Sequence, residues 1–276
     1  MEGYAYYNGT IGLCDEITIP LTDRLIYFGD GVYDVIVGHD GKLFLEDEHM
    51  ERFFSNMSIL NIQPPGEKQE IKETIHKLIG HSGYRSYLVY VSASRNSPQR
   101  MHSYLHADGT NLLIIIREFA MGTDGKLDLI TTEDKRYKFC NIKTTNLLPS
   151  VLASTMAESR GCYEAIFIRD GIITECSHSN IFIAKGNRLI THPASNLILS
   201  GIIRGFVIKN AADWGIEVVE KAFSIEDLYA ADEVLVTSTT KLICEAKTVD
   251  GIAVGGRNPN LIEMLKTYIL DSYMQI

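Results

Sequence analysis

The segment CNIKTTNLL, residues Cys140–Leu148, places Lys143 in a polar interval between two expected elements. A strand is expected before it at Leu127–Thr131, and a helix is expected after it at Ser150–Arg160. A lysine in such a loop is most often a solvated ammonium, because lysine is almost never buried without a partner. It can also be a desolvated amine with a lowered pKa that forms a Schiff base with a carbonyl cofactor. The segment alone leaves both interpretations open, so the decision rests on the remainder of the chain.

The composition is that of an ordinary globular protein with room for two domains. The chain has 276 residues, of which 45% are hydrophobic and 22% are charged. Its formal net charge of -9 argues against nucleic acid or an anionic membrane as the main partner, although a local site for a small anion needs only a few residues. The five cysteines include no C-x-x-C pair, which favours free thiols and a cytoplasmic location. No signal peptide, spanning helix or metal-ligand spacing is present, so we expect no membrane segment and no metal.

Hydrophobic periodicity predicts a smaller α+β domain over residues 1–120 and a polar, Gly-containing linker over residues 121–125. The expected strands are Tyr4–Gly12, Glu16–Ile19, Val32–Gly38, Lys42–Leu45, Tyr87–Ala93 and Asn111–Arg117. The expected helices are Glu46–Leu60 and Lys68–Ile79. In the first of these helices the apolar side chains follow offsets of three and four, and Arg52 lies off that stripe.

A larger α+β domain is expected over residues 126–276 and includes Lys143. Besides the strand and the helix that flank Lys143, the expected strands are Ala165–Arg169, Ile172–Thr174, Asn180–Ala184, Leu189–Thr191, Glu217–Glu220, Glu233–Thr237 and Ile243–Val249. The expected helices are Gly201–Trp214, Ile225–Tyr229 and Asn260–Tyr273. The pattern predicts mostly antiparallel sheets, and the cleft between two domains is a favoured place for a ligand.

Three features carry groups that are suited to a phosphate. In the segment Ile198–Arg204 a Ser-Gly pair opens a predicted helix, which leaves the backbone amides of Ile202 and Ile203 available to an anion. The segment Thr237–Thr240 ends a predicted strand with four hydroxyls in a row, and Arg52 has the neutralising charge. Helix capping, turn capping and a solvent-exposed arginine explain the same features equally well.

Two further positions carry charged groups that a ligand could use. Glu175 stands in the segment Thr174–Asn180 between two predicted strands, and a buried carboxylate there needs a cationic partner such as a pyridinium nitrogen. Arg100 and His102 lie in the loop Ser94–Gly109, where an extended backbone would turn both side chains to one side and let them hold a carboxylate. For Arg100 and His102 the alternative is an ordinary solvent-exposed loop without a ligand.

Seven stretches together resemble the pyridoxal-phosphate-dependent aminotransferases of fold type IV (class IV), and among them most closely the D-amino-acid aminotransferases. They are FGDGVY at 28–33, EHMER at 48–52, R-x-H at 100–102, IK-x-x-NLL at 142–148, TE-x-S-x-SN at 174–180, L-x-GI-x-R at 199–204 and TSTT at 237–240. Each stretch is weak singly, but their order and spacing are specific and cover nearly the whole chain. The resemblance implies a two-domain α+β fold, with the active site in the interdomain cleft and pyridoxal 5'-phosphate as cofactor.

The resemblance also implies roles for individual residues. Lys143 would be the Schiff-base lysine, Glu175 the partner of the pyridine nitrogen and Tyr33 the phenol beside the cofactor. The implied contacts of the cofactor phosphate and ring are the side chain of Arg52, the amides of Ile202 and Ile203, the hydroxyls of Ser238 and Thr239, and the side chain of Leu199. The substrate carboxylate would be bound by Arg100 and His102 of the neighbouring subunit with Tyr90 nearby, which implies a homodimer.

The implied reaction is ping-pong transamination between a D-amino acid and a 2-oxo acid such as 2-oxoglutarate or pyruvate. Branched-chain L-aminotransferases, which lack the arginine and histidine pair, and aminodeoxychorismate lyase are alternatives within the same fold. The chain departs from the family at Ile203, where threonine is usual, and at His178, where the D-amino-acid enzymes carry serine. An unrelated alternative is a serine acyl enzyme with an S-x-x-K motif at Ser238–Lys241, but that class also needs S-D-N and K-T-G motifs and a serine at a helix start.

Overall fold

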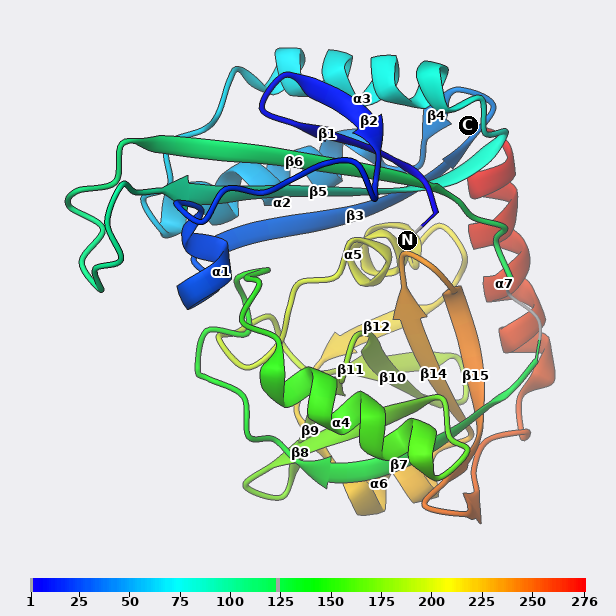
Figure 1. Cartoon of the computed structure of the whole chain (residues 1–276). Helices are drawn as coiled ribbons and strands as arrows, with labels where there is room; N and C mark the ends of the chain where they lie inside the picture. Colours follow the sequence, from blue (N-terminus) through cyan, green and yellow to red (C-terminus); the bar gives the residue numbers. More distant parts are fainter. Residues whose placement is uncertain (1, 123–124) are drawn as a thin grey trace. The chain divides into compact units, whose positions relative to one another are not determined.

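The computed structural model describes residues 2–122 and 125–276. The chain divides by its packing into two compact units, each built from a β-sheet and helices (Figure 1). The first unit contains Met1–Met121, Ile142–Asn146 and Ile276, and the second contains Gly122–Asn141 and Leu147–Gln275. Residues 123 and 124 of the expected linker lie outside the described residues.

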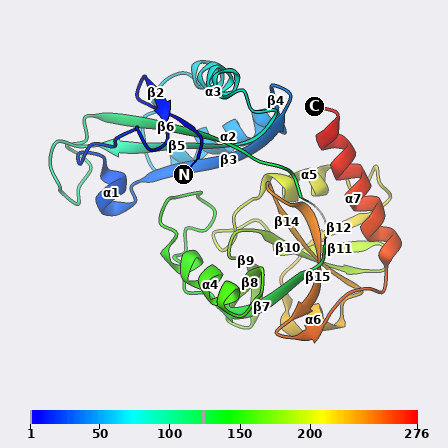
Figure 2. The ribbon, with the colours of Figure 1, turned by 45° about the vertical axis from the view of Figure 1, so that its right-hand side comes forward.

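The first unit is an antiparallel sheet with the strand order β2-β1-β6-β5-β3-β4 (Figure 2). Its strands are β1 (Tyr4–Tyr7), β2 (Thr10–Leu13), β3 (Gly31–His39), β4 (Lys42–Leu43), β5 (Ser86–Asn96) and β6 (Gly109–Glu118). Its helices are α1 (Arg24–Phe28), α2 (Glu46–Ile59) and α3 (Lys68–Ser82). The core lies between the sheet and the two long helices, where Ile36, Phe53 and Ile75 are fully buried. The predicted apolar stripe of the first long helix is therefore the face that packs on the sheet.

The N-terminal region differs from its sequence-based prediction in two places. The expected strand Tyr4–Gly12 is a hairpin instead, because the turn Asn8-Gly9 with φ values of 46° and 96° reverses the chain between β1 and β2. The expected strand Glu16–Ile19 does not form. There the Glu16 carboxylate accepts the backbone N–H of Leu13 at 3.1 Å, and the Glu16 N–H donates to the Leu13 carbonyl at 3.0 Å. These local bonds make a turn, which removes the segment from the sheet.

The second unit contains a ten-stranded sheet with the order β12-β11-β10-β14-β15-β7-β8-β9-β13, in which β16 also pairs with β15. Its strands are β7 (Leu127–Glu133), β8 (Glu164–Arg169), β9 (Ile172–Cys176), β10 (Asn180–Lys185), β11 (Arg188–Thr191), β12 (Glu217–Glu220), β13 (Phe223–Ser224), β14 (Glu233–Ser238), β15 (Leu242–Val249) and β16 (Ile252–Ala253). Its helices are α4 (Leu148–Ser159), α5 (Ile202–Asn210), α6 (Ile225–Ala230) and α7 (Pro259–Met274). The pairs β7–β8, β7–β15 and β11–β12 are parallel, and the other pairs are antiparallel.

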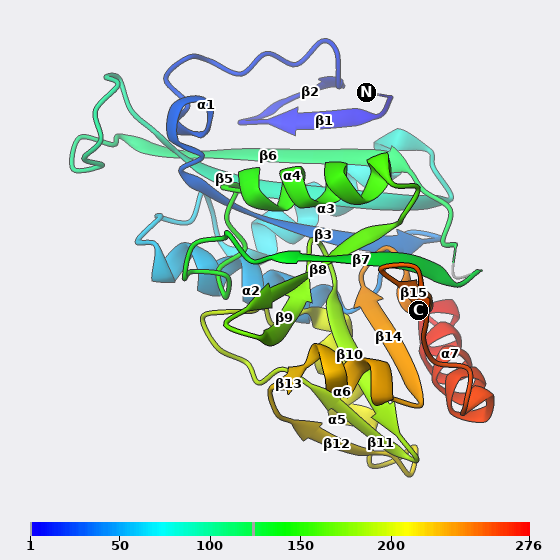
Figure 3. The same ribbon diagram turned by 90° about the horizontal axis from the view of Figure 1, so that it is seen from below.

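Helices cover parts of this second sheet. Helix α4 packs on β7 and β8, α5 packs on β14, and α7 packs along β15. Figure 3 shows α7 beside β15. Side chains such as Phe167 on β8 and Phe182 on β10 are buried within the unit. The mixture of helices with mainly antiparallel strands is the predicted α+β class.

Several absences apply to the described part of the chain. No helix among residues 2–122 and 125–276 is long and apolar enough to cross a membrane. Within the same residues no group of three His, Cys, Asp or Glu side chains has an arrangement that could hold a metal ion. All five cysteines are free thiols.

Candidate active site

Backbone pairing with the first unit fixes the position of Lys143. The Tyr33 N–H donates to the Lys143 carbonyl at 3.0 Å, and Thr144 forms an isolated bridge with Val32. The Thr145 N–H donates to the Gly31 carbonyl at 3.1 Å. The segment Ile142–Asn146 therefore packs with the first unit, whereas the sequence pattern assigned Lys143 to the second domain. The reason is that β3 offers backbone partners, which sequence order alone does not reveal.

Two predicted tyrosines lie in the same part of the first unit as Lys143. The Lys143 Nζ atom lies 4.6 Å from the centroid of the Tyr33 ring. The Tyr33 ring stacks on the Tyr90 ring, with 5.3 Å between their centroids. Burial raises the pKa of Tyr90 to about 12, so this phenol is neutral at pH 7. Tyr33 on β3 and Tyr90 on β5 thus meet through the antiparallel pairing of these two strands.

A buried ion-pair cluster orients Arg52. Arg52 donates from Nε to Asp34 Oδ2 at 2.8 Å and from Nη2 to Asp34 Oδ1 at 2.7 Å. His49 Nδ1 also donates to Asp34 Oδ1, at 2.7 Å. Burial alone would raise the pKa of Asp34, but Arg52 and His49 together outweigh it and hold that pKa well below its usual range. Arg52 is therefore directed by a fully buried carboxylate, and is not the solvent-exposed helical arginine of the alternative interpretation.

His49 lies in the stretch EHMER at 48–52, but the sequence analysis gave it no role. Burial lowers its pKa despite the opposing effect of Asp34, and the positive charges of Arg52 and Lys143 lower it further. The imidazole is therefore neutral at pH 7. Its Nε2 atom is buried and has no hydrogen-bond partner among the described residues. A buried polar atom of this kind requires a partner, such as a water or a ligand atom.

Arg100 and His102 lie in the loop between β5 and β6, and both are exposed in the first unit. The Arg100 guanidinium lies 5.2 Å from the centroid of the Phe28 ring. The His102 ring lies 5.3 Å from that same ring. The two side chains therefore share one aromatic support on α1, a helix that the sequence analysis did not predict because five residues are too few for a periodic pattern.

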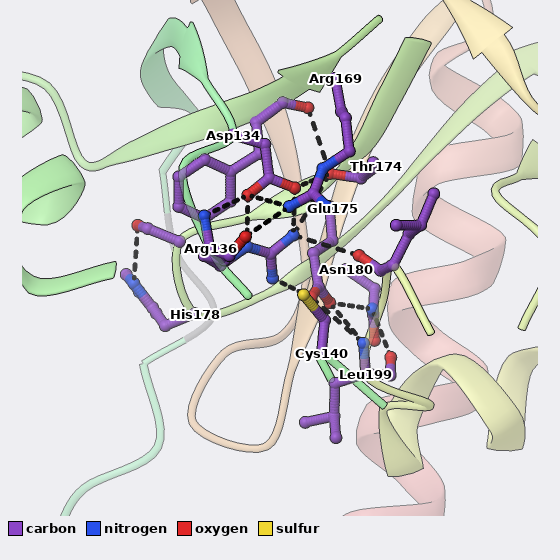
Figure 4. Close-up of polar contacts among 12 residues, drawn as sticks. Asp134, Arg136, Cys140, Arg169, Thr174, Glu175, His178, Asn180 and Leu199 are labelled. Atoms are coloured by element: carbon purple, nitrogen blue, oxygen red, sulfur yellow. Dashed lines mark hydrogen bonds and ion pairs between the residues drawn. The ribbon is translucent and has the colours of Figure 1, made fainter. Parts of the chain in front are cut away.

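In the second unit Glu175 lies within β9, not in the connection after it, and only 4% of its surface is exposed. Its carboxylate accepts hydrogen bonds from a guanidinium nitrogen of Arg136 and from Asn180 Nδ2, the latter at 2.9 Å. The backbone N–H of Leu199 adds a third donor at 3.0 Å (Figure 4). The predicted need of Glu175 for a cation is thus met in part by Arg136, a residue that the sequence analysis missed.

Arg136 is itself held by Asp134. Arg136 donates from Nε to Asp134 Oδ1 and from Nη2 to Asp134 Oδ2, each at 2.9 Å. Arg169 Nη2 lies 3.1 Å from the same carboxylate (Figure 4). Burial would lower the pKa of Arg136, but Asp134 and Glu175 reverse this and raise it above its usual value. Two guanidiniums and two carboxylates thus form one network that fixes the orientation of Glu175.

The helix α5 provides donors suited to an anion. Its N-cap is Gly201, whose missing side chain leaves the first amides, including those of Ile202 and Ile203, without a side-chain cap. The Ile203 side chain is buried, so at this position, where the family usually has threonine, only the backbone amide is offered. A Cβ atom at Gly201 would lie 2.0 Å from Asn180 Oδ1. Gly201 is therefore required for Asn180 to keep its place beside Glu175.

Hydroxyl groups end strand β14. Ser238 is the last residue of the strand, and Thr239 follows it in a turn; both are half-buried. The Thr237 hydroxyl is buried and has no hydrogen-bond partner among the described residues. Because Ser238 ends a strand and does not start a helix, the geometry required by the S-x-x-K alternative is missing.

His178 follows Glu175 in the turn between β9 and β10. Its Nδ1 lies 3.2 Å from the carboxylate of Glu164, which also accepts the Ser179 hydroxyl at 2.8 Å. Burial raises the pKa of Glu164 against the opposing effect of His178. The histidine at this departure from the family pattern is therefore oriented by a fully buried acid.

The chemistry of the residues described above fits pyridoxal phosphate. Lys143 would supply an amine, Glu175 would supply a carboxylate for a protonated ring nitrogen, and α5 would supply uncapped amides for a phosphate. Two buried polar atoms, Thr237 Oγ1 beside Ser238 and His49 Nε2 on α2, have no hydrogen-bond partner among the described residues, which is compatible with a bound polar ligand. These kinds of groups agree with the resemblance to aminotransferases of fold type IV.

Solved structures share the fold of this chain. A branched-chain aminotransferase from Thermoproteus uzoniensis superposes with a TM-score of 0.90 at 25% sequence identity, covering 99% of this chain and 96% of the other. A branched-chain aminotransferase from Escherichia coli shows the same fold with a TM-score of 0.86 at 24% identity, covering 97% and 93% of the two chains.

The chain belongs to the amino-transferase class IV family, whose family model matches residues 31–249. A D-alanine aminotransferase from Bacillus licheniformis is 33% identical over 272 residues, covering 97% of this chain and 96% of the relative. A D-alanine aminotransferase from Listeria monocytogenes serotype 1/2a (strain 10403S) is 34% identical over 269 residues, covering 93% and 91%. The protein is therefore a pyridoxal-phosphate-dependent aminotransferase.

Proposed function

We propose that this protein transfers the amino group of a D-amino acid to a 2-oxo acid such as 2-oxoglutarate or pyruvate. The observation that carries the proposal is the placement of Arg100 and His102 on one aromatic ring, Phe28. In this proposal the two side chains, which both contact this ring, bind one carboxylate together. The full-length similarity to D-alanine aminotransferases supports the same substrate class.

Lys143 is the central catalytic residue in this proposal. Its amine would hold the cofactor as a Schiff base and, when free, would take a proton from and return it to the substrate Cα. When bound, pyridoxal phosphate accepts the electron pair left on Cα. The backbone bonds from Tyr33 and Thr145 keep the lysine segment in one conformation, so the amine returns to the same place after each proton transfer. The Tyr33 phenol lies beside that amine and would shield it from solvent.

The other proposed roles follow from the donor sets described above. Glu175 would pair with the protonated ring nitrogen, since Arg136, Asn180 and the Leu199 amide hold its carboxylate in one orientation. The proposed phosphate and ring contacts are the side chain of Arg52, the amides of Ile202 and Ile203, the hydroxyls of Ser238 and Thr239, and the Leu199 side chain.

Arg100 and His102 bind the substrate carboxylate in this proposal, with Tyr90 close to it. By the family resemblance the two residues serve the active site of a second copy of the chain, so the protein acts as a homodimer. The free cysteines agree with a reducing, cytoplasmic location.

A branched-chain L-amino-acid aminotransferase is the second candidate, because the solved structures named above have that activity in their names. The two candidates are separated by steady-state assays of 2-oxo acid release from D-alanine, D-glutamate and L-leucine, with aminodeoxychorismate as a test of lyase activity. We expect turnover with the D-amino acids. Turnover with L-leucine and none with either D-amino acid would replace the proposal by the branched-chain function.

A further inference from the structure

Arg24 on α1 holds the backbone of the loop that carries Arg100 and His102. This loop, residues 97–108, joins β5 to β6. Arg24 donates from one guanidinium nitrogen to the Met101 carbonyl and from Nη2 to the His102 carbonyl at 3.0 Å. Only 5% of the Arg24 side chain is exposed, although the loop around it is open to solvent. One planar guanidinium thus binds two successive peptide carbonyls, a geometry that a lysine cannot reproduce.

The base of this contact is Asp30. Arg24 Nε donates to Asp30 Oδ2 at 2.7 Å, and Arg95 donates to the other oxygen of the same carboxylate. The Arg95 N–H also donates to the Asp30 carbonyl at 3.2 Å. Asp30 therefore fixes the direction of Arg24 relative to β5, the strand from which the loop departs. The guanidinium is thereby preorganised for the loop carbonyls.

The short helix α1 supports the loop side chains as well. The Arg24 guanidinium lies 4.7 Å from the Phe28 ring centroid, on the ring that also contacts Arg100 and His102. The helix is tied to the sheet because its N-cap, Asp23, accepts the Leu25 N–H at 2.9 Å and the buried Tyr7 hydroxyl at 3.0 Å. Backbone and side chains of the loop are thus held from one element.

Apart from the ring contacts on α1, other ties of this loop lie on either side of residues 100–102. The Ser97 N–H donates to the Thr22 carbonyl at 3.0 Å, and the Arg95 guanidinium lies 4.1 Å from the Tyr104 ring centroid. Arg100, Met101 and His102 are all exposed, so burial of apolar surface does not fix them. Exposed polar loops are mobile unless specific bonds tie them. The hydrogen bonds from Arg24 are therefore the restraint whose loss we expect to release the loop.

We propose that Arg24 is a positioning residue for substrate binding, which sets the loop conformation in which Arg100 and His102 meet the substrate carboxylate. This inference rests on the proposed function for its substrate, but the restraint on the loop is independent of it. A displacement of about 1 Å in a substrate-holding group is enough to lower the efficiency of an enzyme strongly. Because Arg24 does not touch the reacting atoms, its loss acts on substrate affinity more than on turnover.

The test compares the holoenzyme with its Arg24→Met and Arg24→Lys variants. The matched control is Arg85→Met, which removes an exposed arginine that donates to Asp40 at 3.0 Å and precedes β5, whereas the loop follows the other end of that strand. Hydrogen exchange reports on the loop, where the Met101 and Ala107 amides have internal hydrogen bonds to lose. Steady-state kinetics with D-alanine report KM and kcat separately.

For Arg24→Met we expect loop exchange at least about tenfold faster and a KM for D-alanine at least about tenfold higher, with kcat within about threefold of the parent. Arg24→Lys keeps the ion pair with Asp30, so its loop exchange and its KM should lie between those of the parent and those of Arg24→Met. Arg85→Met should match the parent in both. Unchanged loop exchange in Arg24→Met would overturn the inference, and so would faster exchange with an unchanged KM. If the parent enzyme fails to use D-amino acids, the proposed function fails, while the exchange measurement still decides whether Arg24 restrains the loop.

Discussion

The ammonium of Lys143 lies 4.6 Å from the centroid of the Tyr33 ring, and the backbone N–H of Tyr33 donates to the Lys143 carbonyl. Strand β3 therefore holds both the backbone and the side chain of the lysine. This double contact explains how a residue in an irregular segment can have a defined position. It also predicts that activity is sensitive to the replacement of Lys143, whereas replacement of a lysine that only lies over a tyrosine ring, such as Lys241, should leave activity unchanged.

Replacing Lys143 by Ala should reduce transamination to less than about one thousandth of the parent rate, because the amine that moves the proton is lost. The matched control is Lys241→Ala, since Lys241 Nζ also lies over a tyrosine ring, at 5.7 Å from the Tyr163 centroid. Rates of 2-oxo acid formation check both variants. A Lys143→Ala enzyme that retains most of its turnover would refute the role of this lysine.

Replacing Arg136 by Met should lower the free energy of unfolding by about 3–5 kcal/mol, because Asp134 and Glu175 would stay buried after losing a partner. The control Arg188→Met removes an exposed pair with Glu217 and should cost no more than about 1 kcal/mol. Urea denaturation followed by circular dichroism measures both. Equal stability of the two variants would mean that the buried network does not contribute to the fold.

Replacing Gly201 by Ala should weaken cofactor binding by about tenfold or more, because the new Cβ would lie 2.0 Å from Asn180 Oδ1 and displace the amide that holds Glu175. Gly205→Ala on the same helix is the matched control, since its Cβ meets no atom within 4 Å. That change should leave cofactor affinity unaltered and stabilise the helix by about 0.5–1 kcal/mol. Titration of the apoenzyme with pyridoxal phosphate measures the affinities. Equal affinities of the two variants would contradict the role given to Asn180.

The Asp34 cluster should make stability depend on pH on the acid side. The folded-state pKa of Asp34 lies below its ordinary value of 3.8, so the unfolded chain takes up this proton at higher pH than the folded one. Its contribution is therefore complete above about pH 5 and is lost as the pH falls through 4 and below. Asp34→Asn should lower the free energy of unfolding by about 3–5 kcal/mol at pH 7 and flatten its fall between pH 5 and pH 3.

Thermal or urea unfolding at several pH values checks the Asp34 prediction. Asp40→Asn serves as the control, because Asp40 forms exposed contacts with Arg85 and His39. A slope between pH 5 and pH 3 that is the same in Asp34→Asn and the parent would show that Asp34 does not titrate with folding.

Long periodic elements were predictable from the sequence, and short ones were not. The predicted helix Glu46–Leu60 is α2 to within one residue at its C-terminal end, since its apolar stripe extends over several turns. Helix α1 has five residues and begins after the N-cap Asp23. A helix this short is not long enough to show a periodic apolar pattern in the sequence. The expected strand Glu16–Ile19 failed because a local turn competes with the sheet for the same backbone groups.

The site shows the same division between local and long-range information. The sequence indicated that a buried Glu175 needs a cation, which follows from electrostatics alone. It did not indicate that Arg136 is that cation, because the two residues are 39 positions apart and meet only through the pairing of β8 with its neighbours β7 and β9. Asp34 and His49 were missed for the same reason, although a histidine three residues before Arg52 on one helix face was an available signal.

The most direct test of D-amino-acid transamination follows the visible absorption of the bound cofactor in the purified holoenzyme after addition of D-alanine or, separately, L-leucine. We expect D-alanine to bleach the band with release of one equivalent of pyruvate, and L-leucine to leave the band unchanged over the same time. Bleaching by L-leucine and none by D-alanine would contradict the proposed substrate class.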